Sequence, residues 1–266
     1  MQVIKYSGNR EPFSPKKIYY TVRDAGGSSK LAKAAIKKVR KNYHKNMTTK
    51  EILDILLDFL KAEAGVSERY NLKRAIMNMG PTGFPFERYF AKILETYGFK
   101  TLVGQKLKGK IIYHEVDIVA EKKSKFMIEC KYHNESGTKT SLHPAMYTYA
   151  RFLDLKRQRF DKGWLVTNTK CSIDARQYAK GVGLKLTSWN FPENQSLQKL
   201  IEKKNLYPIT ILDSVDEELK QKMFDNGLVM LRDFQDFSEE EIKVKLDISE
   251  AKSKNIMKEV YNILNI

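Results

Sequence analysis

The sequence predicts an α/β (α+β) protein, in which a mixed sheet flanked by helices lies between a mostly helical N-terminal region and a small all-helical C-terminal region. Three observations predict this class. In the middle of the chain, short alternating or apolar stretches are separated by amphipathic ones, and this strand–helix–strand order is typical of a sheet with some parallel pairing. Helical periodicity dominates residues 1–80. Residues 205–266 show only helical patterns.

The composition indicates a globular protein with a polyanionic partner. A chain of 266 residues with 42% hydrophobic content can form two or three domains. No stretch approaches the roughly 18 apolar residues of a membrane span, and the start MQVIKYSGNREPF lacks the apolar core of a signal peptide. Cys130 and Cys171 are too few for a disulfide framework or a zinc site, which favours a cytoplasmic location, and without an apolar span no membrane contact is expected. The net charge of +16 favours nucleic acid as the partner.

The expected domains are residues 1–80, 81–195 and 205–266, with a first boundary at the turn-forming GPTGFP of residues 80–85. In the first domain, Ser14 and Pro15 fit the N-cap and first residue of a helix. The predicted elements there are a strand over Gln2–Tyr6, a turn at 7–9, and helices over Lys16–Asp24, Lys30–Tyr43 and Thr49–Ala64.

The predicted order of elements in the middle domain is helix, strand, strand, helix, strand, helix, strand. The elements expected are a helix over 85–97, strands over 113–120 and 125–133, a helix over 143–160, a strand over 163–167, a helix over 172–180 and a strand over 184–189. On the helix of residues 143–160, Met146, Tyr149, Ala150, Leu153 and Phe160 are expected to point inward. In the third domain, helices over 233–246 and 247–264 are separated by a tight turn at Asp247–Ser249.

Two carboxylates and a lysine on the central pair of strands are the strongest candidates for chemistry. A three-residue loop at 122–124 would pair Glu121 with Lys125 and set Asp117 opposite Glu129. Alternation places Val116, Ile118 and Ala120 on one face with Phe126, Ile128 and Cys130, and places Glu115, Asp117, Glu129 and Lys131 on the other. Like charges roughly 5 Å apart repel each other, and a divalent cation removes that repulsion. The alternative is a hairpin with a solvated, charged outer face.

Such a set suits phosphodiester hydrolysis. Asp117 and Glu129 would bind Mg²⁺ or Mn²⁺, and Lys131 would stabilise charge on phosphorus or orient the attacking water. Glu87, beside the apolar face of the helix of residues 85–97, could add a third carboxylate. The group that takes the proton of the water is left open.

The stretches GFPFERYFAKILETYGF, HEVDIVA and IECKYH resemble the Mrr-like branch of the restriction-endonuclease-like PD-(D/E)xK superfamily. The resemblance covers roughly residues 80–190 and implies a metal-dependent DNA endonuclease with Glu87, Asp117, Glu129 and Lys131 at the catalytic positions. Val116 stands where a proline often precedes the aspartate, and His114-Glu115 replaces a glycine-rich segment. Many such nucleases act as homodimers.

Other polar residues near this set have two interpretations each. Arg151 and Asp154 could reach the DNA backbone or the lysine, or form an ion pair with each other on the solvent side of their helix. His114 and His133 are expected on the face opposite Asp117 and Lys131, as core or edge histidines.

The N-terminal stretch VIKYSGNREPFSPKKI, followed by YNLKRAI, resembles the ATP-cone, a small regulatory nucleotide-binding domain. The resemblance implies ATP or dATP as an allosteric ligand, with Lys5, Gly8, Phe13 and Lys17 among the matching positions. Tyr6 and Ser7 replace the usual Arg-Asp pair, so a basic adaptor without nucleotide is the alternative. The P-loop motif is absent from the sequence, so ATP hydrolysis is not expected.

The C-terminal stretches GLVMLRDF and LDISEAKSKNI resemble a degenerate helix–hairpin–helix module. The hairpin glycines are missing and acidic residues outnumber basic ones, so this module is expected to contact protein more than DNA. Together these observations predict a nuclease regulated by ATP or dATP that acts in defence against foreign or modified DNA, or in repair. The alternatives are a non-catalytic nucleotide-sensing DNA-binding regulator and an RNA-directed nuclease.

Overall fold

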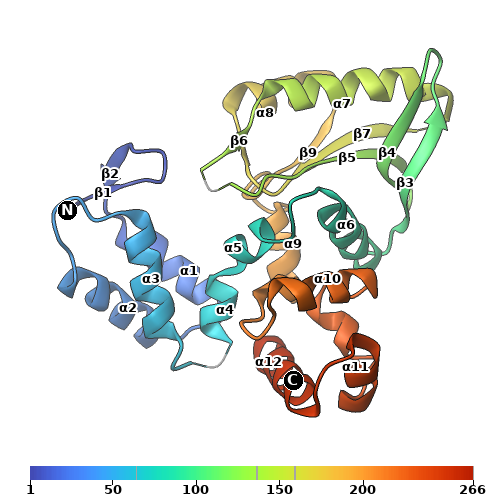
Figure 1. Cartoon of the computed structure of the whole chain (residues 1–266). Coiled ribbons are helices and arrows are strands. Elements are labelled where there is room, and N and C mark those ends of the chain that lie inside the picture. The colour runs from blue at the N-terminus through green and yellow to red at the C-terminus, as the bar shows by residue number, and fades with distance from the viewer. Residues whose placement is uncertain (64, 136, 159, 266) are drawn as a thin grey trace. The chain divides into compact units, whose positions relative to one another are not determined.

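The structure, a computed structural model, describes residues 1–63, 65–135, 137–158 and 160–265. The chain divides into two compact units (Figure 1): Met1–Ala75 combines with Tyr207–Ile266 in one, and Ile76–Leu206 forms the other. None of the described helices combines the length and the apolar character that crossing a membrane requires.

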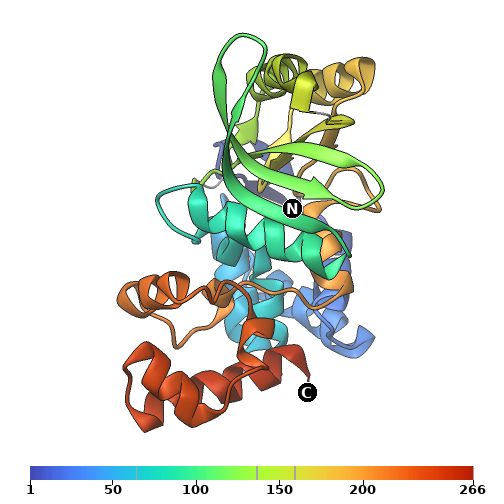
Figure 2. The same ribbon diagram turned by 90° about the vertical axis from the view of Figure 1, so that its right-hand side faces the viewer.

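The unit formed by Ile76–Leu206 is built on a five-stranded mixed sheet of strand order β3-β4-β5-β7-β9, which confirms the predicted class. β3, β4 and β5 are antiparallel neighbours, whereas β5, β7 and β9 run parallel. Helix α6 covers one face of the sheet, and α7 and α8 cover the other (Figure 2). The bounds are α6 Phe84–Thr96, β3 Lys100–Lys108, β4 Tyr113–Glu121, β5 Lys125–Lys131, β6 Lys139–Thr140, α7 Leu142–Asp154, β7 Lys162–Thr167, β8 Lys170–Cys171, α8 Ile173–Val182, β9 Lys185–Thr187 and α9 Leu197–Lys203.

Strand β3 is a full-length element that the sequence pattern did not predict. It lies at the edge of the sheet and pairs with β4 over most of its length. Its outward positions carry Lys100, Lys106 and Lys108, and Gly104 interrupts its middle. Lysine and glycine both have low strand propensity, so the alternation was weak in the sequence although lysines are common on edge strands.

The alternation of β4 changes at Asp117, contrary to the prediction. The β3–β4 pairs on either side are Val103–Ile118 and Gln105–Val116, so Gly104, with φ +66°, and Asp117 fall between two paired positions. Val116 and Val119, three residues apart, belong to one apolar cluster, which a regular strand would not allow. Val116 therefore does not share a face with Ile118 as expected, because the strand is irregular between them.

Helix α7 turns a different face inward from the one predicted. Ala145, Thr148 and Arg151 are buried, whereas Met146 is 45% and Leu153 43% exposed. The predicted stripe was drawn through the largest apolar residues, but the buried face contains small residues and one arginine. The helix also ends at Asp154, before a 3-10 turn at Leu155–Gln158, and Arg159 within the predicted span lies outside the described residues.

The other unit joins an N-terminal helical segment to a C-terminal one. β1 Gln2–Ile4 is shorter than predicted and pairs with β2 Arg10–Pro12, which was not predicted. Helix α3 ends at Leu60, and its predicted last residue, Ala64, lies outside the described residues. The helices are α1 Pro15–Asp24, α2 Ser29–Lys41, α3 Thr49–Leu60, α4 Val66–Tyr70, α5 Leu72–Met77, α10 Glu217–Asp225, α11 Glu239–Leu246 and α12 Glu250–Leu264.

The C-terminal helices follow the predicted turn, with one boundary corrected. Asp247 has φ +50° and ends α11, and the side chain of Ser249 caps α12. The helix predicted to begin at residue 233 begins only at Glu239, after a 3-10 turn at Leu231–Phe234, because Ser238 and Glu241 form a capping box there.

Arg69 of α4 connects the two segments of this unit. Its Nε donates a 2.7 Å hydrogen bond to the carbonyl oxygen of Ala25, and its Nη1 donates a 2.7 Å bond to that of Ile263. Gly65 lies beside this contact with φ +72°, and a Cβ there would lie 2.5 Å from the carbonyl oxygen of Asn262. The end of α12 therefore packs on the N-terminal segment at a position that only glycine allows.

Candidate active site

Asp117 and Glu129 lie where the pairing between β4 and β5 ends. The register matches the prediction, with Glu121 opposite Lys125 and the last pair formed by Ile118 and Ile128. Asp117 and Glu129 are the next residues on the two strands. The Oδ2 atom of Asp117 accepts a 2.6 Å hydrogen bond from the backbone N–H of Cys130, which holds this carboxylate beside β5.

Glu129 is held from helix α7 by Arg151. The Nη1 atom of Arg151 forms an ion pair with Oε2 of Glu129, and both side chains are largely buried. Its Nε is also buried and has no hydrogen-bond partner among the described residues. The solvent-side ion pair expected between Arg151 and Asp154 is therefore wrong, because the face of α7 that carries Arg151 packs on the sheet.

The face of the β4–β5 hairpin that carries Val119 and Met127 is buried. Val119 is 7% and Met127 1% exposed, and both pack in an apolar cluster with Leu155 and Phe160. The alternative of a solvated, charged outer face is therefore wrong. The carboxylates lie at the edge of a buried layer, where they are partly removed from water.

Glu87 brings a third carboxylate close enough to act on the other two. It lies in the first turn of α6. Burial, followed by the charges of Asp117 and Glu115, raises the pKa of Glu87 to about 7. Burial, followed by the charge of Asp117, raises the pKa of Glu129 to about 7 although Arg151 opposes the shift. Burial also raises the pKa of Asp117 against the opposing effects of the Cys130 N–H and Arg151. The site thus concentrates negative charge in poorly solvated surroundings.

Lys131 ends β5 two residues beyond Glu129. It pairs with Thr167 of β7 in the parallel register, and its side chain is exposed. Its positive charge opposes the rise in the pKa of Glu129 that burial and Asp117 cause. The structure therefore brings Lys131 within electrostatic range of Glu129, at the end of β5.

The donor set fits a hard divalent cation. Mg²⁺ takes oxygen ligands and is commonly held by one or two carboxylates, with water and substrate oxygens completing the octahedron. Asp117 and Glu129 offer such oxygens, and a cation between them would favour the ionised forms, against the burial that raises both pKa values and the charge of Asp117 that adds to the rise at Glu129. Over the described ranges of the chain, no group of three or more His, Cys, Asp or Glu side chains is placed to enclose a metal. A two-carboxylate site open to substrate is the arrangement that these residues support.

The two histidines near the strands have local partners. His114 Nε2 lies 2.8 Å from Asp154 Oδ2, so His114 contacts α7, the helix that also holds Glu129. This placement follows from the irregularity of β4 at Asp117. His133 Nε2 lies 3.2 Å from the hydroxyl of Thr140. Both side chains are held by these contacts, and that of His114 is largely buried on the inner strand β4.

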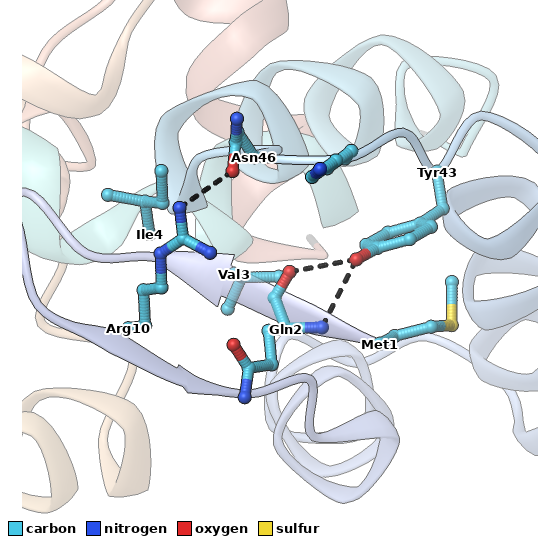
Figure 3. Close-up of a pocket in the computed structure, with 8 residues that line it drawn as sticks. Met1, Gln2, Val3, Ile4, Arg10, Tyr43 and Asn46 are labelled. Carbon is cyan, nitrogen blue, oxygen red and sulfur yellow. Dashed lines mark hydrogen bonds between the residues drawn. The ribbon is translucent and has the colours of Figure 1, made fainter.

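A separate pocket lies in the N-terminal segment (Figure 3). Its volume is about 230 Å³, and its lining comprises Met1, Gln2, Val3, Ile4, Arg10, Tyr43, Lys45 and Asn46. Arg10 donates a 2.9 Å hydrogen bond to the side chain of Asn46. The hydroxyl of Tyr43 lies 3.0 Å from the carbonyl oxygen of Gln2 and 3.1 Å from its N–H.

The residues predicted to bind nucleotide lie outside this pocket. Lys5 and Lys17 form ion pairs with Glu11 at 2.6 and 3.3 Å, Gly8 forms the hairpin turn with φ +79°, and Phe13 packs against the apolar core. The pocket residues Arg10 and Lys45 were missed. Their distance in sequence from each other hid them, and the only signal was that both are basic residues.

Three family models match successive parts of the chain. They are the ATP cone domain over residues 1–76, Restriction endonuclease over residues 78–193, and AF1548-like, C-terminal over residues 207–264. An uncharacterized protein of Archaeoglobus fulgidus is 41% identical over 175 residues, which are 65% of this chain and 99% of that protein. The chain belongs to the AF1548-like family.

The crystal structure of a protein of unknown function, AF1548, supports the same assignment. It is 38% identical, has a TM-score of 0.62, and covers 69% of this chain and 99% of its own. This AF1548-like protein therefore combines an ATP-cone domain with a restriction-endonuclease-like catalytic domain, as the two resemblances predicted. Its C-terminal helices match the AF1548-like C-terminal model.

Proposed function

We propose that this AF1548-like protein is a Mg²⁺- or Mn²⁺-dependent endodeoxyribonuclease. The observation that carries the proposal is the group of Asp117, Glu129 and Glu87 at the end of the β4–β5 pairing, with Lys131 beside it. The match to a restriction endonuclease model over residues 78–193 supports DNA as the substrate. The function would serve defence against foreign or modified DNA, or repair, with a homodimer suited to cutting both strands.

Each side chain has a distinct part in this proposal. Asp117 and Glu129 would hold the cation, which when bound supplies charge neutralisation at the phosphate and lowers the pKa of water. The Cys130 N–H and Arg151 position these carboxylates. Lys131 stabilises charge that develops on the phosphate oxygens. Glu87, with its pKa raised to about 7, is suited to accept a proton from water near neutral pH.

Cleavage of supercoiled plasmid with Mg²⁺ or Mn²⁺ tests the proposal. Asp117→Ala and Lys131→Ala are each expected to slow cleavage by about 100-fold or more. The matched controls Asp174→Ala and Lys180→Ala change exposed residues of α8 and should cut like the parent. Parent-like cleavage by Asp117→Ala would defeat the proposal. Metal-independent binding without cutting would select the non-catalytic regulator, and preferential cleavage of matched RNA would select the RNA-directed nuclease.

We further propose that ATP or dATP binds the N-terminal segment and regulates cleavage. The match to the ATP cone domain over residues 1–76 supports nucleotide binding, and the pocket beside Arg10 and Lys45 supplies positive charge for phosphates. Calorimetry with ATP and dATP should show weaker binding by Arg10→Ala than by the control Lys16→Ala, which changes an exposed lysine away from the pocket. Loss of binding in Lys5→Ala or Lys17→Ala, with Arg10→Ala unaffected, would favour the residues named from the sequence.

A further inference from the structure

The loop between β3 and β4 exposes a group of large apolar side chains. Ile111 is 82%, Ile112 58% and Tyr113 60% exposed. In both views the β3–β4 hairpin extends beyond the rest of the sheet (Figures 1 and 2). Consecutive exposed apolar residues at the end of a projecting hairpin are unusual in a soluble domain and indicate a binding surface. We call Gly109–Tyr113 the hairpin tip.

Hydrogen bonds hold the hairpin tip in one conformation. The carboxylate of Asp154 accepts bonds from the N–H groups of Ile111 at 2.9 Å and Ile112 at 3.4 Å, and the carbonyl oxygen of Asp154 accepts one from Lys110 N–H at 2.9 Å. A Cβ at Gly109 would lie 1.9 Å from Oδ2 of Asp154, so only glycine fits there. The isoleucines are thus exposed by a specific, hydrogen-bonded loop.

Lysines surround these apolar side chains. Lys106 and Lys108 lie on the exposed face of β3, and Lys110 is exposed within the hairpin tip. Lys106 Nζ lies 5.9 Å from the ring centre of Tyr113, and Lys108 pairs with Tyr113 across the strands. The acidic neighbours are Glu115, which pairs with Lys106, and Asp154, whose carboxylate is engaged by the N–H groups of Ile111 and Ile112 and by His114. The local charge is therefore positive, as a contact with phosphates requires.

The hairpin tip has a defined position relative to the candidate active site. Tyr113 and Glu115 precede Asp117 on β4, and Glu115 lies close enough for its charge to act on both Asp117 and Glu87. Asp154 and Arg151, one helical turn apart on α7, hold the hairpin tip and Glu129 respectively. Ile112 and Ile111 precede Asp117 by five and six residues, the first of which belong to the loop and the rest to β4, so an extended path between them is roughly 17–20 Å. That distance is about half a helical turn of B-form DNA.

We propose that the hairpin tip is a wedge for duplex DNA, in which Ile111 and Ile112 enter the minor groove while Lys106, Lys108 and Lys110 contact the flanking phosphates. This inference rests on the proposed function and adds the mode of substrate contact. Apolar side chains that enter the minor groove unstack base steps and bend the duplex, and basic neighbours make the accompanying phosphate contacts. The lysines favour this partner over a second copy of this basic chain.

Binding measured at several salt concentrations distinguishes the contribution of the two isoleucines from that of the lysines. Binding of the full chain to a labelled duplex is measured by fluorescence anisotropy in EDTA, between about 50 and 200 mM salt. The double variant Ile111→Ser/Ile112→Ser is expected to bind at least about tenfold more weakly with an unchanged salt slope, because apolar contacts release no counterions. Lys106→Gln/Lys110→Gln is expected to lower the slope by about 0.9 for each phosphate that the variant no longer neutralises. The control Ile173→Ser removes an isoleucine of α8 that is 64% exposed and should bind like the parent.

A second measurement tests insertion itself. A duplex carrying 2-aminopurine at successive positions should brighten on binding of the parent and of Ile173→Ser, and stay quenched with Ile111→Ser/Ile112→Ser. If the double variant shows the affinity and the brightening of the parent, the wedge is overturned. It is also overturned if the parent does not bind duplex DNA. If the parent sediments as a dimer and the double variant as a monomer, while both have the same affinity for DNA, the tip is assigned to contact with a second copy of the chain instead.

The two proposals fail in distinguishable ways. If the isoleucine variant loses affinity and brightening but Asp117→Ala cuts like the parent, the wedge stands and the nuclease assignment falls. If cleavage depends on Asp117 while the isoleucine variant binds like the parent, the nuclease assignment stands and the wedge falls.

Discussion

Arg151 and Glu129 form an ion pair between α7 and β5, 22 residues apart in sequence. The pair ties the helix that covers one face of the sheet to a carboxylate of the candidate active site. Glu129 is thus oriented from outside its own strand. Removing a partner from a buried pair leaves an uncompensated charge in poorly solvated surroundings, so the consequences reach both stability and catalysis.

Arg151→Ala is expected to lower the free energy of unfolding by about 3–5 kcal/mol. The measurement is urea unfolding at pH 8, where Glu129, with a pKa of about 7, is mainly ionised. The matched control is the double-mutant cycle with Glu129→Gln, in which the loss should be much smaller because the buried charge is gone. An equal loss in both backgrounds would show that Arg151 acts through packing alone.

The carboxylates predict how stability depends on pH. Glu87 and Glu129 have pKa values of about 7 in the folded protein, above their ordinary value of 4.5. The folded state therefore binds more protons than the unfolded chain in this interval, and the metal-free protein should lose stability as the pH rises from about 4.5 to 7. Thermal unfolding in EDTA measures the slope, which Glu87→Gln and Glu129→Gln should each reduce.

Mg²⁺ should reverse this trend, because a cation competes with protons for the same carboxylates. The rise in melting temperature on adding Mg²⁺ is expected to be larger at pH 8 than at pH 5.5, and to be lost in Asp117→Asn. A rise that does not change with pH would show that the ion binds elsewhere.

Arg69→Met is expected to destabilise the protein by at least about 2 kcal/mol, because two buried carbonyl oxygens lose their donor. These are the carbonyls of Ala25 and Ile263, on the two segments that form the unit. Arg74→Met, at an exposed position of α5, is the control and should have little effect on the urea midpoint. Limited proteolysis should release the C-terminal segment from Arg69→Met first, and equal protease resistance of the two variants would contradict this role.

Lys185 predicts a pH effect of the opposite sign. Burial, with a contribution from Lys162, lowers the pKa of Lys185 to about 8, and its Nζ lies 3.4 Å from the ring centre of Trp164. The unfolded chain keeps this proton up to about pH 10.5, so the parent should gain stability relative to Lys185→Met as the pH rises from about 8 to 10.5. The control Lys180→Met should show a constant difference over that range, and a constant difference for Lys185→Met as well would contradict the assignment.

Local patterns were sufficient for the central strands and for the candidate residues on them. The spacing of Asp117, Glu129 and Lys131 and the three-residue loop between their strands predicted the observed register, since turn length sets the pairing of a hairpin. The helix starts at Pro15 and Thr49 and the turn at Asp247–Ser249 likewise follow from capping residues. The functional roles of these residues remain predictions.

Long-range contacts could not be predicted in this way. β3 is rich in lysine and contains Gly104, so its strand character comes from pairing with β4. The inward face of α7 depends on which surface of the helix meets the sheet, and the most apolar positions were not on it. The correct inward face is the one that carries Ala145, Thr148 and Arg151, which the apolar pattern alone did not indicate.

The sequence by itself determined the class of fold and the pairing of the two acidic strands, because turns, caps and alternation act over a few residues. The families of its segments were indicated by the resemblance of short motifs. Only the tertiary structure decided that Arg151 holds Glu129, that Arg69 joins α4 to α12, and that Asp154 exposes Ile111 and Ile112. Each of these contacts joins residues far apart in the chain. Their free energy depends on burial and on hydrogen-bond geometry, which exist only after the elements have packed.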